Sequence, residues 1–186
     1  MKKHASIVLV VLVVLGIGGC NLYNGLVDKS EGVDKAWSDI NAMLQRRADL
    51  VPNLVNAVKG YASHEKEVFE NVAEARSKLA GAKTPAEAAE ADAALSGALG
   101  RLLAIAEAYP ELKANENFLK LQDELAGTEN RIAVARKDYN AMVEDYNASI
   151  RRLPASLIAG PLGFEKKDYF EPPAGSAVQV APTVAF

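Results

Sequence analysis

The longest periodic segment of the sequence reads VDKAWSDINAMLQRRADLVPNLVNAVKG, from Val33 to Gly60. Its apolar residues recur at alternating steps of four and three, and the same steps continue to Leu79. This spacing places the apolar side chains on a single stripe, which is typical of helices that pack lengthwise. Only Arg47 and Glu65 are polar members of the stripe. The segment therefore predicts long helices with an apolar seam.

Two further segments repeat this pattern. One runs from Ala88 to Tyr109, and the other places an apolar residue at every seventh position. The members of the second series are Phe118, Leu125, Ile132, Tyr139, Tyr146 and Leu153. No stretch alternates between apolar and polar residues as a half-buried strand does. The expected fold class is therefore all-α.

Signals for helix ends divide these segments. Thr84 to Glu87 form a capping box with proline at the first helical position. Either Asn115 or Asn117 can cap the helix that follows, and Leu153-Pro154 ends it. Gly60 is a candidate helix stop, and Ser63 is a candidate cap for the next helix.

A turn near Gly60 decides the architecture. With the turn, the predicted helices span residues 28–59, 64–81, 85–108 and 115–153. The long first and last helices then cover each other in an antiparallel up-and-down four-helix bundle. The alternative has three long helices with an unbroken first helix, which the continuous phase of the seam across Gly60 favours. We expect Pro52 to kink the first helix rather than to end it.

The N-terminal segment, residues 1–20, has the form of a signal or anchor. A basic start is followed by an aliphatic run from Ala5 to Ile17, which is shorter than the ~20 residues of a spanning helix. Ile17 to Cys20 resemble a bacterial lipoprotein processing site, at which the Cys20 thiol accepts a lipid. The alternatives are an uncleaved anchor and plain secretion with a buried thiol. In the first two cases the basic flank stays in the cytoplasm and the body is exported.

The remainder of the chain divides into three parts. Residues 21–153 form the predicted bundle domain, and residues 154–170 contain enough aromatic side chains to pack on it. Residues 171–186 are expected to be disordered.

Composition excludes several classes of function. The net charge of -3, with no basic run interleaved with aromatics, excludes a nucleic-acid surface. His64 is the only histidine outside the N-terminal segment, and no second histidine follows it at metalloprotease spacing. Exposed carboxylates such as Glu65 and Glu67 are interpreted as a solvated helix face. We therefore expect no catalytic residue, no cofactor and no metal; the alternative is a carboxylate- or metal-dependent hydrolase with an unrecognised site.

Two Tyr-Asn pairs lie one heptad apart, at Tyr139-Asn140 and Tyr146-Asn147. We interpret the tyrosines as seam residues and the asparagines as polar residues that fix helix register. The alternative is that the asparagines bind a ligand.

Arg47 is a charged residue at a core position, so it needs a partner. Arg47 lies twelve residues before Lys59, and Gly127 lies twelve residues after Asn115, at the matching level of an antiparallel partner helix. We therefore predict an ion pair between Arg47 and Glu129, with a hydrogen bond from Thr128. The alternative is that Arg47 extends along its aliphatic stem to solvent.

Several of these segments, in this order, resemble the LemA family of bacterial membrane-anchored proteins over about residues 21–170. The segments that carry the resemblance are Tyr23 to Val27, Ala36 to Ser38, Arg46 to Val55, Lys59 to Glu65, Ala75-Arg76, Tyr109 to Asn115, Phe118, Thr128 to Ile132, the two Tyr-Asn pairs, Ile158 to Gly160 and Gly163-Phe164. The resemblance implies a helical bundle outside the cytoplasm, without family-wide catalytic residues. It also implies a role in membrane organisation or stress, since one branch takes part in building magnetosome membranes.

Together these observations predict a non-enzymatic scaffold or binding protein. Its expected partners are the membrane and other membrane or envelope proteins or peptides. Its expected location is the periplasmic or cell-surface side of a membrane.

Overall fold

The structure is a computed structural model that describes residues 2–172, with side chains from residue 18 onward. It contains helices α1 (Lys2–Lys59), α2 (Lys66–Gly81), α3 (Pro85–Ala106), α4 (Pro110–Lys113) and α5 (Glu116–Arg151), followed by the 3-10 helix η1 (Ala155–Leu157). No strand occurs within this range, so the all-α prediction is confirmed. Most of the segment that was expected to be disordered, residues 173–186, lies outside the described residues.

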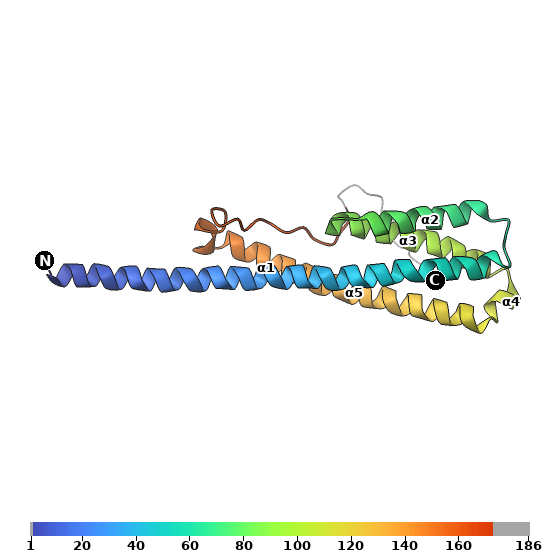
Figure 1. The fold of residues 1–186 in the computed structure, drawn as a ribbon, viewed down its shortest axis with the longest axis horizontal. Helices are drawn as coiled ribbons and strands as arrows, with labels where there is room; N and C mark the ends of the chain where they lie inside the picture. Colours follow the sequence, from blue (N-terminus) through green and yellow to red (C-terminus); the bar gives the residue numbers. More distant parts are fainter. Residues whose placement is uncertain (1, 173–186) are drawn as a thin grey trace, which may run out of the picture.

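The long helices α1 and α5 lie side by side and antiparallel, as predicted (Figure 1). The hairpin of α2 and α3 covers them only toward the turn at residues 60–65, which we call the distal end. Toward the other, proximal end, the chain after η1 runs back along the pair instead. The alternative with an unbroken first helix is wrong, because the chain turns between Lys59 and Lys66.

Two predicted helix starts are wrong. The first helix begins at Lys2 rather than at residue 28, so no break separates the N-terminal segment from the bundle. Ser63 does not cap α2; Glu65 occupies the N-cap position, without a side-chain cap hydrogen bond. Among the described residues, no helix carries an apolar stretch long enough to cross a membrane.

Two predicted caps are confirmed. The Thr84 side chain accepts a hydrogen bond from the Glu87 amide, and the Glu87 carboxylate accepts one from the Thr84 amide. At the start of α5, the Asn115 side chain accepts from the amides of Asn117 and Phe118. These bonds satisfy amides that helix geometry leaves without a partner.

The core follows the predicted seams on both sides of the turn. The buried residues of α1 include Val33, Ile40, Leu44, Val51, Leu54 and Val58. On α2, Val72, Ala75 and Leu79 are buried as predicted, while Phe69 is buried in place of Val68. Tyr61 lies in the turn and is exposed. Leu153 also departs from its predicted seam: it follows the end of α5 and is 75% exposed.

Candidate functional site

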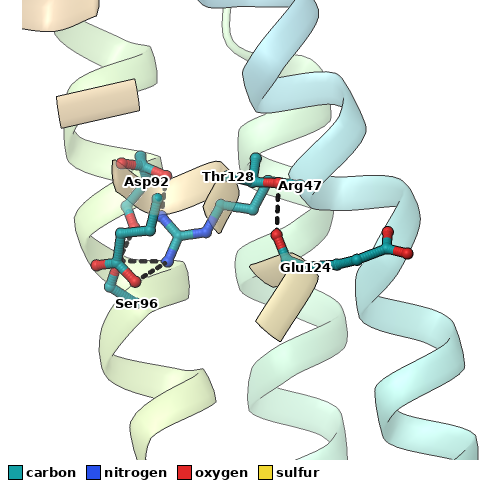
Figure 2. A network of polar contacts seen from close by, with 6 residues as sticks. Arg47, Asp92, Ser96, Glu124 and Thr128 are labelled. Atoms are coloured by element: carbon teal, nitrogen blue, oxygen red, sulfur yellow. Dashed lines mark hydrogen bonds and ion pairs between the residues drawn. The ribbon is translucent and has the colours of Figure 1, made fainter. Parts of the chain in front are cut away.

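Arg47 is the most deeply buried charged side chain among the described residues, with 3% of the side chain exposed. Its Nη1 donates to Asp92 Oδ1 at 2.5 Å, and its Nη2 donates to Ser96 Oγ at 2.9 Å. Figure 2 shows the guanidinium pointing toward these two residues of α3. The hypothesis that Arg47 extends to solvent is therefore wrong.

The predicted ion pair between Arg47 and Glu129 is present, but it is longer and more exposed than the pair of Arg47 with Asp92. Glu129 Oε2 is 3.5 Å from Arg47 Nη2, and 59% of the Glu129 side chain is exposed. The predicted hydrogen bond from Thr128 is wrong, because its hydroxyl donates to the Glu124 carbonyl on the same helix at 2.7 Å (Figure 2). Asp92 was missed, although it occupies a seam position in the segment from Ala88 to Tyr109. A polar residue at a seam position could have identified Asp92 as a partner of Arg47.

The electrostatics of this cluster indicate a structural role. Burial raises the pKa of Asp92 above its ordinary value, and the nearby Arg47 charge opposes the rise without cancelling it. The Ser96 hydroxyl donates to the Asp92 carbonyl at 3.0 Å while it accepts from Arg47, so no base is in place to activate it. The cluster therefore ties α1 to α3, with Glu129 of α5 at its edge.

A second polar site lies on α5, where side chains hold the C-terminal strap, which we define as residues 164–170. Asn147 Nδ2 donates to the Lys167 carbonyl at 2.9 Å, and Asn147 Oδ1 accepts from the Lys167 amide at 2.9 Å. Asn140 repeats the pattern with Phe170, at 3.4 and 2.8 Å. Each asparagine thus binds both backbone groups of one strap residue. The interpretation that they fix helix register is wrong.

The neighbouring tyrosines add two further bonds to the strap. Tyr146 donates to the Glu165 carbonyl at 2.9 Å, and Tyr139 donates to the Asp168 carbonyl at 2.8 Å. Both rings are buried, as the seam predicted. Asn140 and Asn147 are seven residues apart on the helix, which corresponds to a rise of ~10.5 Å. Their partners Phe170 and Lys167 are three residues apart in extended chain, which spans ~10 Å, so the two spacings match.

We call the four side chains of α5 that bind the strap, Tyr139, Asn140, Tyr146 and Asn147, the ladder. Two side chains of the strap also contact α1. Phe170 is buried and lies beside Trp37, with ring centroids 6.3 Å apart. Lys167 pairs with Asp34 of α1 at 2.7 Å. Gly163, just before the strap, has a φ of 80°, which a residue with a side chain adopts only with strain. Trp37 itself is half-buried.

The ladder recognises backbone rather than sequence. All four of its side chains contact carbonyl or amide groups of the strap. Two features of the sequence could have indicated this site. Asn140 and Asn147 are one heptad apart on one helix face, and the strap is rich in aromatic residues but has no helical periodicity. The chemistry of the site is therefore the binding of an extended segment.

The remaining sequence-predicted residues lie apart from both sites. Cys20 is exposed on α1, before the bundle begins. His64 is exposed in the turn between α1 and α2. Within the described residues, no three carboxylate, imidazole or thiol groups gather closely enough to hold a metal ion.

The fold and the two polar sites define an elongated helical-bundle protein with a strapped C-terminal segment. The chain belongs to the LemA family, whose model matches residues 36–186. It is 31% identical to the magnetosome proteins MamQ 1 and MamQ 2 of Paramagnetospirillum magneticum, over 96% of this chain and 76% of each relative. It is 26% identical to the protein LemA of Metamycoplasma hominis, over 75% of this chain and 64% of that protein.

Proposed function

We propose that this LemA-family protein is a non-enzymatic scaffold, held at a membrane by its N-terminal segment with the bundle outside the cytoplasm. The observation that carries the proposal is the continuity of α1. One helix runs from Lys2 through the bundle to Lys59, so a membrane that holds the N-terminal segment also holds the central helix. The basic residues Lys2 and Lys3 favour the cytoplasmic side for the start of the chain.

Cys20 is the proposed attachment point. It is exposed where α1 leaves the aliphatic run, so its thiol is accessible to a lipid donor. A diacylglycerol on Cys20 and an uncleaved anchor both place residue 20 at the membrane surface. The two modes differ in whether residues 1–19 are removed.

The scaffold role is supported by the character of the polar sites. Arg47 and Asp92 tie helices together, and the ladder on α5 binds backbone. Two relatives are named as magnetosome proteins rather than as enzymes. The partners we propose are other membrane or envelope proteins or peptides, recognised through the outer surface of the bundle.

Attachment is tested by expressing the full chain in a bacterial host and separating membranes from soluble protein. We expect the chain in the membrane fraction, with the bundle digested when protease is added to spheroplasts. Intact mass then distinguishes the two modes of attachment. Loss of residues 1–19 with a lipid adduct, both abolished by Cys20→Ser, indicates the lipoprotein, and a retained N-terminal segment without lipid indicates the anchor.

Two outcomes contradict the proposal. Recovery of the full chain in the soluble fraction contradicts membrane attachment, and full protection from protease in spheroplasts contradicts the exported bundle. The non-enzymatic part is tested with Glu65→Gln and Glu67→Gln, which should still rescue a deletion strain. Loss of rescue by a folded variant favours a carboxylate-dependent activity instead.

A further inference from the structure

The loop between α5 and the strap, residues 152–163, exposes three leucines, and we call it the proximal loop. Leu153, Leu157 and Leu162 are 75%, 70% and 50% exposed. Single exposed leucines are ordinary, but three on one loop beside an apolar hollow form a patch. The hollow has a volume of about 270 Å³ and is lined by residues of α1 and of this loop, including Leu22 and Pro154.

The proximal loop lies against the first turns of α1 that follow Cys20. Leu26 packs against Ala155 and Ala159, and Tyr23 meets Phe164 edge to face with ring centroids 5.7 Å apart. In Figure 1 only α1 continues beyond this loop at the proximal end. The loop is therefore the part of the body nearest to residue 20.

The charged residues at the proximal end favour binding to an anionic surface. Arg151, the last residue of α5, and Arg152, the first residue of the loop, are both exposed. No aspartate or glutamate occurs between Arg151 and Phe164. Exposed leucines next to arginines are the composition of a segment that lies in the interface of an anionic membrane.

The short distance between residue 20 and the proximal loop favours lipid rather than protein as the partner of this loop. Residues 22–26 lie ~3–9 Å beyond residue 20 along α1. The polar layer on each side of a bilayer core is ~5–8 Å thick. A membrane that holds residue 20, through a lipid on Cys20 or through an uncleaved anchor, thus reaches the level of the proximal loop.

We propose that the proximal loop docks on the bilayer that holds the N-terminal segment, with its leucines in the interface and with Arg151 and Arg152 on anionic lipid headgroups. The proposal rests on the membrane attachment proposed above. With two contacts instead of one, α1 and α5 both have a fixed position at the membrane surface. Neither attachment mode for Cys20 changes this geometry.

The test uses the full chain in vesicles of phosphatidylglycerol and phosphatidylcholine, with brominated phosphatidylcholine as a quencher of tryptophan fluorescence. A tryptophan is added by Leu157→Trp. The matched control is Leu119→Trp, because Leu119 is also exposed, at 45%, but lies in the first turn of α5, roughly 45 Å from the proximal end. The native Trp37 is roughly 25 Å along α1 from residue 20 and serves as an unquenched reference.

We expect the emission from Leu157→Trp to fall roughly twofold in brominated vesicles, since tryptophan at an interface lies within reach of the lipid chains. Emission from Leu119→Trp and from the wild-type chain should not change. In the Leu157→Trp chain, Arg151→Gln with Arg152→Gln should reduce the equilibrium constant for docking on anionic vesicles roughly fivefold for each arginine removed.

The outcomes separate the two proposals. If the chain does not float with vesicles, membrane attachment itself fails. If the chain floats but Leu157→Trp is not quenched, attachment stands and the docking of the loop is overturned. A blue-shifted emission without quenching also overturns it, because a second copy of the chain then covers the loop.

Discussion

The contact between Arg47 and Asp92 should dominate the energy of the buried cluster. The two side chains are only 3% and 14% exposed, so removing either partner leaves the other charge buried without its nearest counter-charge. Such a change typically costs about 3–5 kcal/mol. We therefore expect Arg47→Met and Asp92→Leu each to lower the free energy of unfolding by about 3 kcal/mol or more.

The double variant should recover most of this loss. Burial already outweighs the Arg47 charge in setting the pKa of Asp92, and Arg47 Nε is buried without a hydrogen-bond partner among the described residues. A polar cluster that is only partly satisfied gains little over apolar packing. The combination of Arg47→Met and Asp92→Leu should thus be within about 1 kcal/mol of wild type, giving a coupling of several kcal/mol.

Urea unfolding followed by circular dichroism measures all the variants of this cycle. The control is the pair of Arg46 and Glu124, which joins α1 to α5 at 3.3 Å but is 60% and 51% exposed. That pair should couple by less than about 1 kcal/mol, and so should Arg47 with Glu129. A coupling below about 0.5 kcal/mol for Arg47 with Asp92, or an equal coupling in the control, refutes the reasoning.

Three further predictions concern pH, capping and the strap. The raised pKa of Asp92 contributes stability that is present below its unfolded value, near 3.8, and is lost as pH rises through its folded pKa. The free energy of unfolding of wild type minus that of Asp92→Asn should therefore fall from pH 3.8 toward neutrality, and a rise contradicts the shift. Thr84→Ala removes a capping-box acceptor and should cost about 1 kcal/mol in urea unfolding, whereas Thr84→Ser should cost little; equal losses contradict the cap. Asn147→Ala leaves two backbone groups of the strap unpaired, so trypsin should cleave after Lys166 on the order of tenfold faster, and an unchanged rate argues against the ladder.

Sequence periodicity was sufficient to predict that the chain forms long helices and that the first and last of them pair antiparallel. Stripes of apolar residues identify which face of a helix is buried, and caps such as that of Thr84 locate the ends. Counting residues from the two ends of an antiparallel pair gives the level of Arg47 along the bundle, but not the direction in which its side chain points. For this reason Glu129 was placed at the right level, while the nearer Asp92 on a third helix was missed.

The strap shows where periodicity stops being informative. An extended segment has no helical repeat, and its register depends on backbone groups that every residue carries. The amino-acid sequence from Phe164 to Phe170 does not indicate which carbonyl accepts the hydrogen bond from Asn147. The same limit explains Leu153, which continues a heptad in sequence although the helix has already ended at Arg151.

The unbroken length of α1 makes the molecule a spacer of fixed extent. From Cys20 to Lys59 the helix advances roughly 60 Å, and α5 stiffens most of that length. Because α1 and α5 are antiparallel, the spacer cannot be lengthened in one helix alone. An insertion of seven residues must occur in both, at the same level, and would then move the turn at residues 60–65 outward by about 10 Å. Length is thus a property that both halves of the sequence must change together.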